Sequence, residues 1–245
     1  MKTSIIILTY NKLPVIRQCI ESIREYTEAG TYEIIVVDNH SEDGTPEWLK
    51  EQKDIVLISN PENVGFPKGC NQGILKASGD NIMLLNNDTL ATGNWLSNML
   101  RCLYAGEDTG AVGPVTNYCS NLQTVPVNYT TTEEMQSFAR NFNVSDPLKW
   151  EYRKKLVGYC LLVKKSVVDK VGLLDERFSP GNFEDDDYCR RIIIAGYRLI
   201  LCKDTFIHHY GSLSFFDNLP GYIELLEINR KKFEEKWAGY NEAGN

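Results

Sequence analysis

The chain has 245 residues, 42% hydrophobic and 24% charged, which is typical of a globular protein with one sizeable core. Its net charge of −7 argues against a nucleic-acid surface and against general binding to anionic lipid. No apolar run approaches the roughly 20 residues of a membrane span, and the N-terminal run is too short for a secretory signal. The 7 cysteines, an odd number without close pairs, favour reduced, buried thiols. We therefore expect a cytoplasmic protein with no integral membrane span and no nucleic-acid partner.

Apolar, β-branched runs alternate with helical patterns in the first part of the chain. The predicted strands cover residues 4–9, 33–38, 55–58 and 81–85. Between them, apolar residues recur every three or four positions, as over 13–23, which indicates amphipathic helices. This alternation predicts a parallel, doubly wound sheet. Right-handed crossovers would bring Thr9, Asp38 and Asp88 to one edge of it.

The second part of the chain is less regular. A polar loop over residues 116–128 is long enough to act as a flexible lid. Thr131 and Glu134 have the spacing of a capping box, so a helix should begin there. The other predicted elements are helices at 95–103, 166–171, 184–196 and 222–237, and strands at 111–114, 156–163 and 197–202.

The fourth predicted strand ends in the polar cluster Asn86-Asn87-Asp88-Thr89. In open α/β sheets, ligands bind at the carboxyl ends of the strands. A carboxylate with amide neighbours suits Mg²⁺ or Mn²⁺, which keep coordination positions free for a substrate diphosphate. A turn that caps the next helix is the simpler explanation for this segment alone. The metal site gains weight because other segments point to the same edge.

Two further clusters could carry chemistry. Four acids, Glu184 to Asp187, stand at a predicted helix start, where two would suffice to complement the helix dipole. Adjacent carboxylates repel one another, which raises at least one pKa toward that of a general base. His208 and His209 follow a strand near these acids. A buried, hydrogen-bonded histidine is the commoner case, but one of the two could ligate a metal held by Asp88.

The chain lacks a zinc spacing, a P-loop, a dinucleotide fingerprint and a nucleophile elbow. Its short motifs instead follow a recognisable order. They are Thr9-Tyr10-Asn11, Val37-Asp38-Asn39, Asn63-Val64-Gly65-Phe66, Asn86-Asn87-Asp88, Asp175-Glu176-Arg177-Phe178, Glu184-Asp185-Asp186-Asp187 and His209-x-Gly-Ser-x-Ser. In this order, from Ser4 to about Ser214, the chain resembles the family-two glycosyltransferases, which are inverting enzymes with the GT-A fold.

The resemblance implies a nucleotide-sugar site built from the loops that follow the first four strands. Its residues would be Thr9, Tyr10, Asn11, Asp38, Asn63, Gly65, Lys68, Asn71, Asn87 and Asp88. Asp38 would accept a hydrogen bond from N3 of uracil or thymine. Asp88 would hold Mn²⁺ or Mg²⁺ on the diphosphate, with His209 as a further metal or diphosphate contact and His208 less favoured for that role.

The resemblance also implies that Asp185, with Glu184 beside it, is the base that deprotonates the acceptor hydroxyl. A single displacement needs one such base and inverts the anomeric centre, whereas retention would need a nucleophile against the sugar. Many relatives carry Asp-x-Asp at the metal site. Here Asn86 takes the first position, so Asp88 is the only anionic ligand. A Gln-x-x-Arg-Trp motif and membrane helices, both expected of processive synthases, are missing from the sequence, which favours transfer of a single sugar.

We therefore expect one α/β domain over 1–245, with a Rossmann-like, mostly parallel sheet and helices on both faces. It would comprise a nucleotide-sugar-binding half (1–115), a smaller irregular acceptor half (116–215) and a C-terminal helix (216–245). The donor would be a UDP- or dTDP-sugar, and the acceptor a glycan, a lipid-linked molecule or a protein. The chain could belong to a larger multidomain protein.

Two other functions stay open from the sequence. One is a sugar-1-phosphate nucleotidyltransferase, although Thr9-Tyr10-Asn11-Lys12 lacks that class's glycine- and arginine-rich loop. The other is a non-catalytic nucleotide-sugar-binding module, which the single anionic metal ligand keeps in play. The sugar, the acceptor and the oligomeric state do not follow from these motifs.

Overall fold

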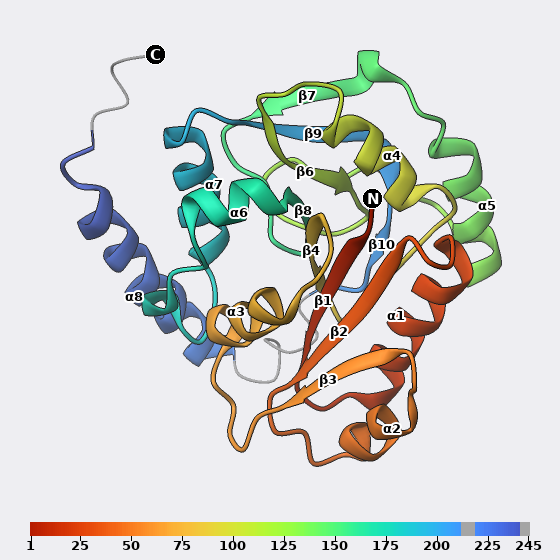
Figure 1. The fold of residues 1–245 in the computed structure, drawn as a ribbon, viewed down its shortest axis with the longest axis horizontal. Coiled ribbons are helices and arrows are strands. Elements are labelled where there is room, and N and C mark those ends of the chain that lie inside the picture. The colour runs from red at the N-terminus through yellow and green to blue at the C-terminus, as the bar shows by residue number, and fades with distance from the viewer. Residues whose placement is uncertain (212–218, 241–245) are drawn as a thin grey trace.

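The computed structural model of the chain describes residues 1–211 and 219–240. Its main sheet contains β1 (Thr3–Thr9), β2 (Tyr32–Asp38), β3 (Ile55–Ser59), β4 (Asn81–Asn86), β6 (Thr109–Val115), β7 (Trp150–Arg153), β8 (Cys160–Lys164) and β9 (Arg198–Phe206). The strand order is β3-β2-β1-β4-β8-β6-β9-β7 (Figure 1). Strands β1 to β4 are mutually parallel, as predicted, because they join through helical crossovers.

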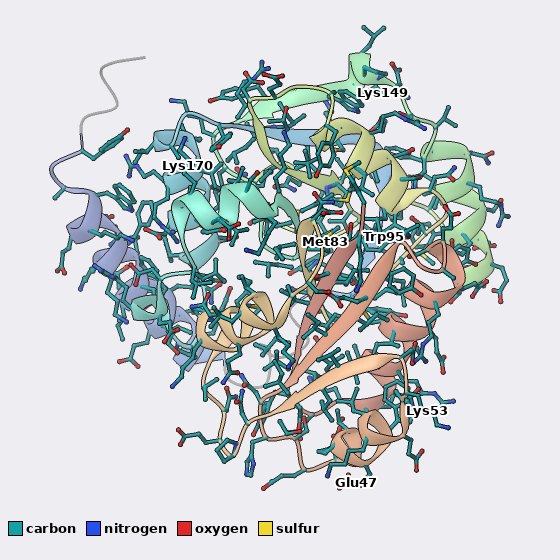
Figure 2. The ribbon with its side chains drawn as sticks, viewed as in Figure 1. Glu47, Lys53, Met83, Trp95, Lys149 and Lys170 are labelled. Carbon is teal, nitrogen blue, oxygen red and sulfur yellow. The ribbon has the colours of Figure 1, made fainter. Side chains whose placement is uncertain are left out.

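Helices cover both faces of this sheet. They are α1 (Leu13–Tyr26), α2 (Thr45–Glu51), α3 (Phe66–Lys76), α4 (Trp95–Leu103), α5 (Thr132–Phe142), α6 (Lys165–Val171), α7 (Glu184–Ile194) and α8 (Leu219–Trp237), with short 3₁₀ turns η1 (Pro147–Lys149) and η2 (Glu176–Phe178). Side chains alternate along β1, so Ile5 and Ile7 pack with α1 and α4 while Ile6 packs with α3 on the other face. Figure 2 shows the buried Met83 and Trp95 inside the molecule.

The halves of the chain share the sheet. Strand β8 lies between β4 and β6 and is antiparallel to both, so a strand from the second half sits in the middle of the sheet. The predicted strand over 156–163 is wrong in its first part, because residues 156–159 turn away from the sheet toward α7. A separate ribbon of β5 (Thr89–Leu90) and β10 (His208–His209) was not predicted, since two-residue strands show no periodicity.

Most predicted helices are confirmed within a residue or two. Helix α4 has the predicted bounds. Helix α5 begins with the predicted capping box, in which the Thr131 hydroxyl accepts a hydrogen bond from the Glu134 backbone N–H at 3.2 Å. The loop over 116–128 carries a buried side chain, Gln123, which donates to the Pro114 carbonyl and accepts from Val157 N–H. Mobility of this loop stays a prediction.

The predicted C-terminal helix is confirmed as α8, which lies against the η2 segment and α7 at one edge of the molecule (Figure 1). The residues after 240 fall outside the described part of the chain, as do Ser212 and Ser214 of the predicted histidine motif. Within residues 1–211 and 219–240, no helix combines the length and the apolar character that crossing a bilayer requires.

Candidate functional site

A cavity of about 680 Å³ opens at the carboxyl ends of β1 and β4. Loops from both halves of the chain form its walls. Nine of the residues predicted from the sequence line it, namely Thr9, Tyr10, Asn63, Gly65, Asn87, Asp88, Glu184, Asp185 and His209. The fold therefore places the proposed metal ligands and the proposed base around one space, although the acids lie about 100 positions after Asp88 in the chain.

Asp88 and His209 meet because β5 and β10 pair beside them. His209 lies opposite Thr89 in this ribbon, and the Tyr210 N–H donates to the Asp88 carbonyl at 2.9 Å. The His209 Nε2 then lies 3.1 Å from the Asp88 Oδ1, and both residues are 6% exposed. The Tyr159 ring stacks on the imidazole with centroids 5.0 Å apart. Neither group can turn away to find another partner.

The hydrogen bonding of His209 fixes which ring nitrogen faces the carboxylate. Its Nδ1 lies 2.7 Å from the Tyr118 carbonyl oxygen, which can only accept, so Nδ1 carries a proton. In the neutral ring, Nε2 then presents a lone pair to Asp88 Oδ1, an atom that is buried without a hydrogen-bond donor. Two facing acceptors repel unless a proton or a cation lies against them. This arrangement fits a divalent cation.

The donor set is small. Among the residues the structure describes, no three His, Cys, Asp or Glu side chains gather around one point. One carboxylate and one imidazole would leave most positions of a hard cation to a substrate diphosphate and water. Such a set suits Mg²⁺ or Mn²⁺ that arrives with its substrate, and it does not suit a closed structural site.

The four acids of α7 have different partners. Asp186 pairs with Lys155 at 2.5 Å, and Asp187 is fully buried between Arg191 and Lys236. Both therefore have structural roles. Glu184 and Asp185 instead line the cavity. Three ion pairs thus engage Asp186 and Asp187, which leaves Glu184 and Asp185 for chemistry.

Asp185 is held by backbone donors. Its Oδ2 accepts from the Gly158 N–H and its Oδ1 from the Asp186 N–H, both at 2.9 Å. A Cβ at Gly158 would lie 3.1 Å from the Asp185 Cβ, so glycine permits this close approach. The carboxylate keeps free lone pairs because each oxygen can accept more than one hydrogen bond. It is thereby oriented without being neutralised by a cation.

Glu184 is in a different state from its neighbour. Burial raises the pKa of its carboxyl well above the usual value, and the nearby charge of Asp185 raises that pKa further. Its Oε2 is buried without a hydrogen-bond partner. A carboxyl that keeps its proton at neutral pH can donate a hydrogen bond into the cavity. The pKa of Glu184 is thus raised toward the range in which a carboxyl can act as a general acid or a hydrogen-bond donor.

Four predicted residues do not line the cavity. Asn11 bridges two loops, accepting from Glu42 N–H, and Asn71 clamps the backbone of Leu174 through both ends of its amide. Lys68 is exposed on α3. Asp38 is 2% exposed and accepts from the Ser41 N–H at 3.2 Å. Asn11 and Asn71 thus make structural contacts, and their contacts with a ligand stay a prediction.

Several cavity residues were not predicted. Apart from Asn39, they are chiefly residues from the second half of the chain and from α8, namely Tyr118, Ser120, Tyr159, Asn182 and Tyr222. Asn182 has a positive φ of 73°, which asparagine adopts more readily than most residues. Asn182, a polar residue just before the acid cluster, was the one local signal in the sequence from which a cavity residue could have been predicted. The others depend on long-range packing.

Comparison with known proteins decides the class of this site. The family model described as "Glycosyl transferase family 2" matches residues 4–172, more than half of the chain. The chain belongs to glycosyltransferase family 2. The family match favours glycosyl transfer over the nucleotidyltransferase alternative. The matched region contains Asp88, whereas Glu184, Asp185, His209 and α8 lie beyond it.

Relatives and solved structures of this family extend the comparison. Glycosyltransferase AglE of Haloferax volcanii is 27% identical over 207 residues, covering 82% of this chain and 64% of AglE. The chain thus spans less than two thirds of that relative. The mannosyltransferase PcManGT of Pyrobaculum calidifontis, solved with GDP-Man and Mn²⁺, aligns with a TM-score of 0.72 at 20% identity, covering 99% of this chain and 66% of PcManGT. GalNAc-T7, solved with UDP, GalNAc and Mn²⁺, aligns with a TM-score of 0.71 at 14% identity, covering all of this chain and 53% of the GalNAc-T7 chain. The fold of this member of family 2 is therefore GT-A, as predicted.

Proposed function

We propose that the chain transfers a single sugar from a UDP- or dTDP-sugar to an acceptor hydroxyl, with inversion and with Mn²⁺ or Mg²⁺. The observation that carries the proposal is the close approach of Asp88 Oδ1 and His209 Nε2, 3.1 Å apart, in the same cavity as Asp185. The Mn²⁺-containing structures of PcManGT and GalNAc-T7 support a divalent cation in this fold.

On the donor side, Asp88 and His209 would hold the cation. When bound, it would offset the negative charge that builds on the leaving diphosphate. Asn87 donates to the Thr9 hydroxyl at 3.1 Å, which ties the metal loop to the end of β1, where Tyr10 enters the cavity wall. Recognition of the base by Asp38 stays a prediction, since Asp38 does not line the cavity.

On the acceptor side, Asp185 would take the proton of the attacking hydroxyl. Its two backbone hydrogen bonds fix the carboxylate in place, which lowers the entropic cost of a productive arrangement. The protonated Glu184 beside it would donate a hydrogen bond to a sugar or acceptor oxygen. With Asp185 as the one proposed base, a single displacement is the simplest route, and that route inverts the anomeric centre.

A panel of UDP-, dTDP- and GDP-sugars, assayed for released nucleotide with Mn²⁺ or Mg²⁺, tests the donor side. We expect turnover of one uridine or thymidine donor, lost with EDTA and in Asp88→Ala because the cation site loses its only anionic ligand. Asp80→Ala removes an exposed acid from the opposite end of β4 and is the matched control. Tight nucleotide binding without turnover of any donor, with or without candidate acceptors, would instead support the non-catalytic binding module.

The base is tested by Asp185→Asn, which keeps the shape of the side chain and removes its basicity. We expect kcat to fall by about 10²- to 10⁴-fold with the donor KM nearly unchanged, as for loss of a general base. Asp186→Asn is the control in the same helical turn, since Lys155 holds that carboxylate. An equal loss in both variants would argue against Asp185 as the base.

A further inference from the structure

The segment from Asp175 to Asp187 lies outside the main sheet and carries the proposed acceptor side of the cavity. It contributes Pro180, Gly181, Asn182, Glu184 and Asp185 to the lining. On its inner side it touches the donor loop, where the Phe66 N–H donates to the Pro180 carbonyl at 2.8 Å. Gly65 approaches so closely that a Cβ there would lie 2.1 Å from the Ser179 Oγ. The contacts on the outer side of this segment therefore help to set the position of Asp185.

Helix α8 supplies that outer support through one buried amide. Asn229 is fully buried, and its Nδ2 lies 2.7 Å from the Phe178 carbonyl, 2.9 Å from that of Gly181 and 3.3 Å from that of Asn182. These carbonyls belong to an irregular turn that has no ladder of its own, so a side chain must satisfy them. A single residue of α8 thus fixes the turn that precedes the acids.

Charged residues on the same face of α8 fasten both ends of the segment. Lys236 contacts Asp175 at 2.7 Å and Asp187 at 2.5 Å, and Lys232 donates to the Arg177 carbonyl at 2.7 Å. Positions 229, 232 and 236 are three and four residues apart, so they share one face of the helix. At its start, α8 places Tyr222 in the cavity wall, with the hydroxyl 3.3 Å from the Asn182 Oδ1.

We propose that α8 is a working part of the acceptor site, in which Asn229 is a positioning residue for Asp185 and Tyr222 forms the wall beside it. The inference rests on the proposed function, because it assigns Asp185 an acceptor-side role. It goes beyond the family match, which ends at residue 172. Asn229 touches no cavity surface of its own and acts through the Phe178–Asn182 turn.

The test compares Asn229→Leu with Asn98→Leu in the full chain. Leucine has about the shape of asparagine but cannot donate to the three carbonyls. Asn98, on α4, is also a buried helical amide, and it donates to the backbone carbonyl of Asn143 in a loop. The readouts are kcat and KM for whichever donor in the panel is turned over, and the affinity for UDP with Mn²⁺ by calorimetry.

For Asn229→Leu we expect kcat to fall by about tenfold or more, since small displacements of a catalytic group can cost up to about 10²-fold. The donor KM and the affinity for UDP should change less than kcat, because Asn229 bonds to the Phe178–Asn182 turn, whereas the proposed cation ligands Asp88 and His209 lie on other elements. Asn98→Leu should lose thermal stability and keep kcat. Equal kcat values in the two variants, or a loss of UDP affinity that matches the loss of kcat, would overturn the positioning role.

If the Asn229→Leu variant fails to fold, the Tyr222→Phe variant tests the proposed role of α8 in its place. It removes only the hydroxyl that reaches Asn182, so the melting temperature should hold while kcat falls at least about threefold. An unchanged kcat would overturn the role of α8. Failure of the proposed function has a different signature, since the unaltered chain would then turn over no donor in the panel.

Discussion

At the residue scale, the raised pKa of the Glu184 carboxyl makes the free energy of unfolding depend on pH. Its pKa is raised in the folded protein by burial and by the charge of Asp185. Below the unfolded value of about 4.3, both states are protonated and the carboxyl costs nothing. As the pH rises, the unfolded chain loses this proton first, so the free energy of unfolding declines until the folded carboxyl ionises as well.

Glu184→Gln removes this dependence, because glutamine resembles the protonated acid. We expect the variant to gain stability relative to the unaltered chain as the pH rises from about 4 to 8, by at most about 1.4 kcal/mol per pH unit. Urea unfolding across that range measures it. Glu47→Gln, on the exposed side of α2, corrects for the loss of one negative charge. A stability difference that stays constant over this range would contradict a buried, protonated Glu184.

At the scale of elements, the loop after β6 supports His209, the proposed metal ligand. Asn117 brackets the backbone of His209, accepting from its N–H at 2.9 Å and donating to its carbonyl at 3.0 Å. The next residue supplies the carbonyl that fixes the imidazole tautomer. A loop predicted as a lid thus also holds His209 in its orientation. Outer partners of this kind tune metal affinity by about 10- to 100-fold.

Asn117→Ala should therefore weaken Mn²⁺ without touching the cavity wall. We expect the Mn²⁺ concentration for half-maximal UDP binding or turnover to rise by about tenfold or more, with turnover recovering at high Mn²⁺. Asn121→Ala is the control, because this exposed asparagine of the same loop donates to the Lys155 carbonyl. A matching rise in both variants would mean that the loop acts through its general order and not through His209.

At the scale of the whole molecule, local signals predicted the first half well. The β-branched runs and the helical spacings fixed β1 to β4 and their parallel order, and Asp88 followed from its place at a strand end. Long-range contacts could not be predicted in this way. The pairing of β5 with β10 joins residues over 100 positions apart, and β8 enters the sheet from the second half. An asparagine in the sequence does not reveal whether its amide binds a ligand or the protein backbone. Asn71, for example, hydrogen-bonds to backbone groups as well as it could to a phosphate.

The central place of β8 makes a prediction about cooperativity. Because this strand joins β4 to β6, the eight-stranded sheet is continuous only when both predicted halves contribute strands to it. We therefore expect one unfolding transition in urea, coincident by far-UV circular dichroism and by tryptophan fluorescence. The fluorescence reports on both halves, since the tryptophans lie in α2, α4, β7 and α8: Trp48, Trp95, Trp150 and Trp237.

A ligand should then stabilise the molecule as one unit. The proposed site takes groups from the β4–β5 turn, α7 and β10, so UDP with Mn²⁺ at 100 times its Kd should raise the free energy of unfolding by about 2.7 kcal/mol by both probes. UDP with EDTA is the control, since it lacks the cation that Asp88 and His209 would share. Two separate transitions, or a shift seen by only one probe, would mean that the site belongs to one half and that the acceptor segment folds independently of it.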